Sequence, residues 1–132
     1  MTAPKRNTWL IVGAVTAVVF GLLTLASGGR TLLGDAAARQ AAGAYVSFVL
    51  WFNFLASFAY VVAGVGLWLQ HRWSVPLAAV IALATAAVFA AFGMHVLTGG
   101  AYEARTVAAM TLRTLVWAGL AWIAYLRLWR PA

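Results

Sequence analysis

Four long apolar segments, separated by shorter polar ones, account for most of the chain. They cover residues 9–26, 44–69, 74–97 and 105–126. A helix needs about 20 mostly apolar residues to cross a bilayer, and a backbone surrounded by lipid must satisfy its own hydrogen bonds. The pattern therefore predicts an all-α, integral membrane four-helix bundle, formed by a single transmembrane domain over residues 1–132.

The longest polar segment, residues 27–43, is expected to be a loop on the outer side of the membrane. Gly28 and Gly29 are expected to end the first span. Asp35 is expected to cap a short helix that reaches Ala42.

The other two connections are short. Only residues 70–72 join the second and third spans, which predicts an antiparallel helical hairpin. Ser74 is expected to cap the third span, with Pro76 in its first turn, where a missing backbone N–H costs nothing. Glu103 is expected to cap the fourth span, with Arg105 neutralising its charge.

The first apolar segment has two interpretations. Lys5 and Arg6 precede it, as basic residues precede the core of a secretory signal peptide. The apolar stretch is longer than a usual signal core, however, and the Leu-Ala-Ser-Gly that follows is a poor cleavage site. The sequence therefore favours a retained first span.

Basic residues near the span ends predict the orientation in the membrane. One side holds Lys5, Arg6, Arg72, Arg127 and Arg130, and the other holds Arg30, Arg39 and Arg105. Because short loops rich in Lys and Arg stay in the cytoplasm, both termini are predicted to be cytoplasmic. An aromatic belt is predicted at the same interface. Its members are Trp9, Trp68, Trp73 and Trp129.

Composition narrows the class of protein. Hydrophobic residues make up 65% of the chain and charged residues 8%, against roughly 45–50% and about 25% in soluble domains. The net charge of +7 is spread over the span ends, so a nucleic-acid partner is not expected. The absence of cysteine excludes disulfides, thiol redox relays and thiolate metal sites. Abundant alanine and eight arginines to one lysine are typical of GC-rich bacteria, which predicts the bacterial cytoplasmic (inner) membrane as the location.

Small residues at four-residue intervals are expected to bring the helices together, because membrane helices associate by close packing. The first span carries Gly13, Ala17 and Gly21 on one face, and the third carries Ala78, Ala82, Ala86 and Ala90. A compact bundle is the favoured interpretation, and a homodimer face on the first span is the alternative. Leucine at position 13 or 21 is expected to weaken whichever contact exists.

One charge lies inside a span. Arg113 is about two turns from the outer end of the fourth segment, at a depth where a charge costs about 2.5–3.5 kcal/mol unless it is paired or turned inward. Three interpretations remain open: a side chain that snorkels to the headgroups, a structural pair, and a contact with an anionic ligand. Depth counting places a candidate polar cluster in the outer half of the bundle. It consists of Asn53, Tyr60, His95, Glu103 and Arg113.

No cofactor is predicted. His71 and His95 lie at opposite ends of the third span, roughly 36 Å apart along a helix, so one haem iron cannot bind both within a subunit. Met94, His95 and Met110 are weak candidates for a soft metal such as Cu(I), although such methionines more often fill gaps in packing. No catalytic motif is present, and spans one to three contain no carboxylate of the kind that proton-coupled exporters use.

In length and layout the chain resembles the small four-span bacterial inner-membrane proteins of the DoxX-like type. It is also similar to hypothetical membrane proteins in the segments WFNFLASFAY and HVLTGGAYEARTVAAMTLRTLVW. The resemblance implies a four-span architecture. It rests on no specific motif, so it assigns no functional residue.

Three function classes follow from these observations. The first is a non-enzymatic accessory or interaction subunit of a membrane complex, working with a membrane-protein partner or as a homo-oligomer. The second is an oligomeric transporter or channel for a small anionic or polar solute that meets Arg113. The third is a redox or metal-handling membrane subunit. The sequence favours the first class because several helices carry small-residue faces suited to helix packing and no catalytic motif is present.

Overall fold

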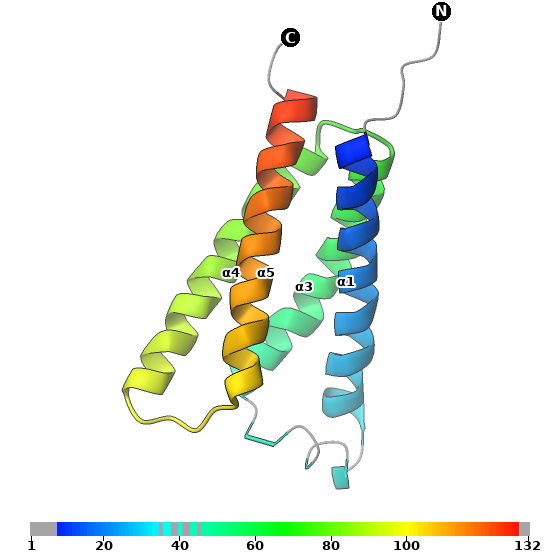
Figure 1. Ribbon diagram of the computed structural model, residues 1–132. Coiled ribbons are helices and arrows are strands. Elements are labelled where there is room, and N and C mark those ends of the chain that lie inside the picture. The colour runs from blue at the N-terminus through cyan, green and yellow to red at the C-terminus, as the bar shows by residue number, and fades with distance from the viewer. Residues whose placement is uncertain (1–7, 35, 38–39, 41–42, 45, 130–132) are drawn as a thin grey trace, which may run out of the picture.

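A computed structural model of the chain describes residues 8–34, 36–37, 40, 43–44 and 46–129. This part is all-α and contains no strand, which confirms the all-α part of the predicted fold class. The helices are α1 (Thr8–Leu33), α3 (Ser47–Trp68), α4 (Ser74–Leu97) and α5 (Ala104–Ala124), and α5 continues as the π-helical turn η1 (Tyr125–Trp129) (Figure 1). All four are long and apolar enough to span a membrane.

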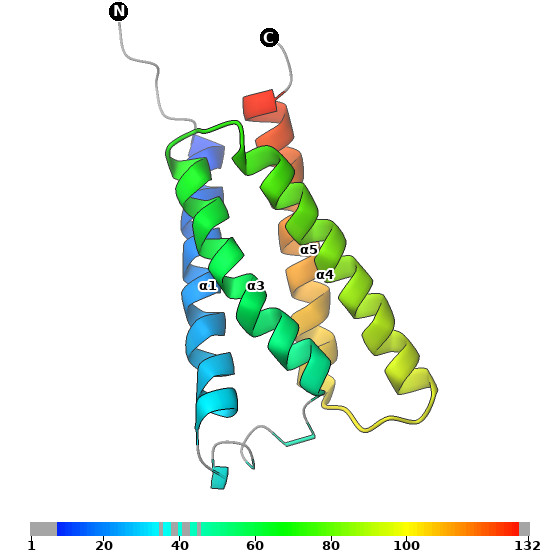
Figure 2. The same cartoon turned by 180° about the vertical axis from the view of Figure 1, so that it is seen from behind.

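The four helices run alternately up and down, so each end of the bundle collects a defined set of chain segments (Figures 1 and 2). The terminal end holds Thr8, Trp129 and the short turn between α3 and α4. The loop end holds the α1–α3 connection and the α4–α5 loop. Within the bundle, α1 packs mainly along α3, and α4 packs mainly along α5.

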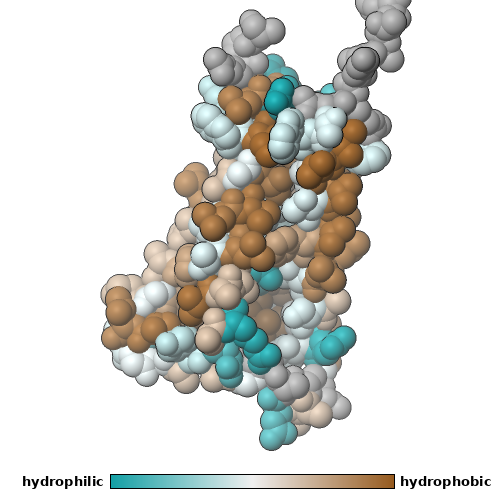
Figure 3. All heavy atoms as spheres, viewed as in Figure 1, coloured by the Kyte–Doolittle hydropathy of each residue, from teal (hydrophilic) through white to brown (hydrophobic). Residues whose placement is uncertain are grey.

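Large apolar side chains cover the outside of the helices. Leu23, Leu83 and Leu115, from three different helices, are 65%, 72% and 67% exposed. Figure 3 shows a largely hydrophobic surface between the two ends, with the strongest hydrophilic colour near the loop end. A surface of this kind suits hydrocarbon as its surroundings.

The first helix is longer than its predicted span. The expectation that Gly28 and Gly29 would end it is wrong, because α1 continues to Leu33. Gly28 is buried and faces Phe54 of α3, where an added Cβ would lie 3.3 Å from the Phe54 side chain. The glycine at position 28 therefore serves close packing between helices.

The start of α4 agrees with its predicted position, but the predicted cap is wrong. Trp73 occupies the N-cap position. The Ser74 hydroxyl donates a hydrogen bond of 2.7 Å to the His71 carbonyl oxygen, and so ties the first turn of α4 back to the short loop. Several other expectations lie outside the described residues. They are the Asp35 cap, the end of its short helix at Ala42, and the positions of Lys5, Arg6, Arg39 and Arg130; of the expected short helix, Ala36, Ala37 and Gln40 are described and are helical.

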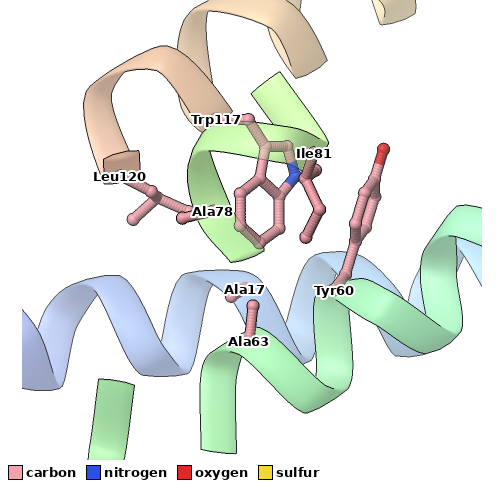
Figure 4. Packing of buried hydrophobic residues seen from close by; sticks show 7 residues of the cluster. All are labelled: Ala17, Tyr60, Ala63, Ala78, Ile81, Trp117 and Leu120. Carbon is pink, nitrogen blue, oxygen red and sulfur yellow. The ribbon is translucent and has the colours of Figure 1, made fainter. Parts of the chain in front are cut away.

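The buried side chains form three layers along the bundle. The central layer contains Ala17, Tyr60, Ala63, Ala78, Ile81, Trp117 and Leu120, drawn in Figure 4. The terminal-end layer contains Leu10, Ala14, Leu67, Val75 and Ala124. The loop-end layer contains Val46, Val49, Phe92 and Met110. The central layer takes residues from all four helices, so it joins the α1–α3 pair to the α4–α5 pair.

Glycines allow α1 and α3 to approach closely. A Cβ added to Gly21 would lie 2.8 Å from Val61 Cγ2 and 3.0 Å from the Ser57 carbonyl oxygen. A Cβ added to Gly64 would lie 2.6 Å from Val18 Cγ2 and 3.0 Å from the Ala14 carbonyl oxygen. The small-residue face of the first span is thus used inside the bundle.

The alanine face predicted on the third span is only half correct. Ala78 is buried and Ala82 is partly buried, whereas Ala86 and Ala90 are exposed. Towards the loop end the buried positions of α4 are Ile81, Thr85 and Phe92. Figures 1 and 2 show α4 and α1 diverging in this direction, so larger side chains are needed to fill the space.

The predicted aromatic belt gathers at the terminal end. Trp9, Trp68, Trp73 and Trp129 are 42–57% exposed there. The Arg72 guanidinium lies 4.8 Å from the centroid of the Trp129 ring, and His71 stacks on Trp73. This arrangement suits a membrane–water interface, where amphipathic rings and basic groups meet the headgroups.

Two glycines provide a matched test of this packing. We expect Gly21→Ala to lower the free energy of unfolding by about 1–3 kcal/mol, because the new methyl group overpacks the α1–α3 contact. Gly119→Ala on α5, where nothing lies within 4 Å of an added Cβ, is expected to leave stability unchanged or raise it slightly. Thermal unfolding in detergent measures both changes. Equal stability of the two variants would show that the α1–α3 contact is not as close as described.

Candidate functional site

Arg113 lies well inside the bundle, on α5. Arg113 and Thr24 are equally far along the chain from the loop ends of their helices, which are Ala104 for α5 and Leu33 for α1. At a rise of about 1.5 Å per residue, both lie roughly 13–14 Å from the loop end. The Arg113 Nη1 donates a hydrogen bond of 2.9 Å to the Thr24 hydroxyl oxygen. The side chain therefore runs across the bundle at constant depth and does not snorkel to the surface.

The contacts of Arg113 only partly compensate its charge. Besides the bond to Thr24, its Cζ lies 5.1 Å from the centroid of the Phe20 ring, a cation–π geometry. Its Nε is buried and has no hydrogen-bond partner. The residue as a whole remains partly exposed.

No carboxylate neutralises Arg113 within the described residues. Glu103 is the acidic residue among them, and it lies well before Arg113, at the N-cap of α5. The expected side-chain cap is wrong, since Glu103 makes no cap hydrogen bond. Its Oε1 instead accepts a hydrogen bond of 2.8 Å from the Ala44 backbone N–H.

Glu103 and His95 belong to the loop end. The Glu103 carboxylate holds the chain just before α3, and it lies so close to Gly43 that a Cβ there would collide with it. Gly43 has a φ of 73°, which also favours glycine. The His95 ring bonds through Nε2 to the Ala101 carbonyl oxygen at 2.9 Å and covers Gly100 in the same way. Both side chains thus organise loops.

A second group of polar atoms lies at the centre of the bundle. Tyr60 Oη, Thr85 Oγ1 and Trp117 Nε1 are buried without a hydrogen-bond partner, and each of these residues has an exposed fraction of 0%. The Tyr60 and Trp117 rings have centroids 4.8 Å apart, at 37° to one another. Figure 4 shows the two rings side by side between the helices. Asn53 Oδ1 is also buried and unpartnered, about two helical turns nearer the loop end than Tyr60.

The structure therefore divides the candidate polar cluster. Arg113 is linked to Tyr60 through Phe20, whose ring meets the Tyr60 ring edge-on at 6.3 Å. Asn53 lies on the same face of α3 as Tyr60, nearer the start of that helix. His95 and Glu103 make their hydrogen bonds in the loops and none with Arg113.

The weak metal candidates do not come together. Met110 is fully buried in the loop-end layer, whereas Met94 is 61% exposed on the outside of α4. His95 is engaged with Ala101. The described residues contain no group of three His, Cys, Asp or Glu side chains that could hold a metal ion.

Four residues at the site escaped sequence reasoning: Phe20, Thr24, Thr85 and Trp117. The position of Trp117 could have been inferred from the sequence, because Trp117 follows Arg113 by about one helical turn on the same face of α5. The position of Thr24 could have been inferred as well, since Thr24 lies between the packing glycines Gly21 and Gly28. Thr85 and Phe20 stand in uniformly apolar helices, where nothing in the pattern distinguishes their positions.

No known protein family, curated protein or solved structure matches the chain. The described residues thus define a four-helix protein, compatible with a membrane, that has a partly buried arginine, Arg113, and a central group of unpartnered polar atoms.

Removal of the Glu103 side chain tests the loop-end contact. We expect Glu103→Ala to destabilise the protein by about 1 kcal/mol, because a charge-assisted hydrogen bond is lost. It should also speed hydrogen exchange at the Ala44 amide, measured by mass spectrometry or NMR in detergent. Glu103→Gln keeps an acceptor oxygen and should retain most of the protection. Unchanged exchange in Glu103→Ala would mean that the Ala44 amide has another acceptor.

Proposed function

We propose that the protein is a non-enzymatic accessory subunit of a membrane complex, embedded in the cytoplasmic membrane of a bacterium with both termini in the cytoplasm. In this proposal, the seam between α1 and α5 receives a transmembrane helix of the partner. That helix carries an Asp or Glu side chain at the depth of Arg113.

The incomplete compensation of Arg113 carries the proposal. A guanidinium about 13–14 Å from the helix end meets one hydroxyl and one aromatic face, and no carboxylate among the described residues. A lone charge at this depth is expensive, and a carboxylate is the group that a guanidinium binds best, often through two parallel hydrogen bonds. Such a partner would neutralise both charges in one contact.

The position of Arg113 also supports a partner that approaches from outside. Arg113 is partly exposed, and α1 and α5 have few direct contacts with each other. Figure 3 shows a small hydrophilic area that interrupts the hydrophobic surface between α5 and α1. A helix lying along this seam would reach Arg113 and would bury apolar side chains of both helices.

The proposed orientation rests on the distribution of basic residues between the two ends of the bundle. Five basic residues lie near the terminal end in the sequence, against three near the loop end. The four belt tryptophans and the Arg72–Trp129 contact lie at the terminal end. An excess of Lys and Arg near the span ends is typical of the cytoplasmic side, and interfacial tryptophans mark a membrane–water interface.

Photo-crosslinking combined with charge variants tests the proposal. The tagged full-length chain is expressed in its own host, with a photoreactive residue in place of Ser27, which is exposed and shares a face of α1 with Phe20 and Thr24. We expect it to crosslink one membrane protein in stoichiometric amount. The same probe at Leu83, on the outside of α4, is the control and should not.

The charge of Arg113 should decide this association. Arg113→Leu is expected to reduce recovery of the partner at least about 10-fold, whereas Arg113→Lys keeps the charge and should retain much of it. Exchange of the partner's acidic residue for Arg, combined with Arg113→Glu, should restore the complex. Undiminished recovery with Arg113→Leu, or a crosslinked partner that lacks an acidic residue in its spans, would refute the proposal.

A second candidate function is an oligomeric transporter or channel for a small anion. The unpartnered donors of Tyr60, Thr85 and Trp117 favour it, because they could meet an anion inside the bundle. Four helices alone rarely enclose a wide path, so this function would require several copies of the chain.

A further inference from the structure

We propose that the centre of the bundle binds a single halide-sized anion, chloride being the physiological example. Four side chains form this donor cluster: Tyr60, Thr85, Arg113 and Trp117. The proposal goes beyond the function proposed above, because it concerns the interior of the bundle and needs no partner protein.

The donor cluster lies at one depth on three helices. Tyr60 on α3 and Trp117 on α5 are equally far along the chain from the loop-end residues of their helices, Ser47 and Ala104. Thr85 is almost as far from Leu97, the loop-end residue of α4. Because the helices rise equally per residue, these three residues lie at similar depth in the bundle. Arg113 lies about one turn of α5 from Trp117, on the same face.

Ring contacts link three of the four side chains. The Tyr60 ring packs against Trp117 at 4.8 Å and edge-on against Phe20, over which the Arg113 guanidinium lies. In Figure 4 the indole nitrogen of Trp117 faces the side of its ring where Tyr60 lies, and the Tyr60 phenol extends away from the Ala17–Ala63 contact. Tyr60 and Trp117 thus form the aromatic side of the cluster, and each ring carries one unpartnered polar atom.

The unpartnered atoms of the cluster are hydrogen-bond donors, so they require a ligand that accepts hydrogen bonds. The indole N–H and the guanidinium Nε–H can only donate, and the two hydroxyl groups can donate as well. All four atoms are buried and unpartnered. Asn53 is the remaining unpartnered buried side chain among the described residues, but it lies about two helical turns from Tyr60, outside the cluster, and its amide carries both donors and acceptors.

Charge and size then point to a halide. The nearby guanidinium has no carboxylate among the described residues, so a negative ligand is favoured over water, which would also need acceptors for its own protons. None of the four atoms is accessible to solvent, so the helices around them must separate slightly to admit a ligand, and a small anion requires the least separation. A monatomic anion accepts hydrogen bonds from any direction, as donors from three helices require.

The packing of the bundle offers an entry route. The α1–α3 and α4–α5 pairs are each closely packed, while fewer contacts join the two pairs. The donor cluster lies between the pairs, with Tyr60 on one and Thr85, Arg113 and Trp117 on the other. A small separation of the pairs would open the cluster without breaking either one.

The test compares chloride with gluconate, an anion too large for the cluster. The purified full-length chain is unfolded thermally in detergent at matched ionic strength in the two sodium salts. We expect chloride to raise the unfolding midpoint saturably, by about 2–5 °C at ten or more times its dissociation constant. Equal midpoints in chloride and gluconate would overturn the proposal.

Conservative variants locate the effect. Tyr60→Phe and Trp117→Phe each remove one donor but keep an aromatic ring, and both should abolish or strongly reduce the difference between the two salts. Tyr125→Phe and Trp122→Phe, whose side chains are 40% and 61% exposed, are the controls and should keep it. A full chloride effect in Tyr60→Phe and Trp117→Phe would overturn the proposal.

A crystallographic experiment on the unmodified protein tests the site independently, even if these variants do not fold. Crystals grown in bromide should show an anomalous peak within hydrogen-bond distance of Tyr60 Oη and Trp117 Nε1. Water or an empty space at that position would refute the site. Loss of the chloride effect in Tyr60→Phe with partner association intact would separate this inference from the proposed function.

Discussion

The close approach of α1 and α3 is the contact on which the rest of the structure depends. Gly21 lies against the backbone of α3 at Ser57, and Gly64 lies against the backbone of α1 at Ala14. In a hydrocarbon solvent, burial of apolar surface does not drive helices together, so close packing of this kind must do so. Because the two helices lie so close, Phe20 and Thr24 face α5, and Tyr60 reaches the centre of the bundle.

The polar interior is the consequence of that geometry. Arg113 extends across to α1 instead of towards the loop end, because Thr24 and Phe20 give its guanidinium a hydroxyl and an aromatic face at its own depth. The contacts are insufficient for a full charge in a medium of low dielectric constant. A structure that retains such a group, together with unpartnered donors at Tyr60, Thr85 and Trp117, is expected to meet something negative in its working state.

The spans were predictable to within a few residues at most ends, because the length of an apolar run reports directly on helices that cross a membrane. The largest error was the loop end of α1, where Gly28 and Gly29 suggested a stop. Glycine ends helices in water, where it frees the backbone, but between membrane helices it also allows contact, as Gly28 does with Phe54. Small residues are likewise found both at helix contacts and on exposed faces, so Ala86 and Ala90 were predicted to pack although they are exposed.

The sequence by itself determined the number of helices, their approximate limits and the presence of one deep charge, because each of these depends only on the local run of apolar and polar residues. Only the tertiary structure decided that Arg113 meets Thr24 and Phe20, that Glu103 and His95 serve the loops, and that Tyr60, Thr85 and Trp117 share one level. These relations depend on the rotation of each helix about its axis and on its tilt. Rotation and tilt are set by contacts between residues that are far apart in the chain, such as Gly21 and Ser57. The pattern of hydrophobic residues along the chain does not contain these contacts.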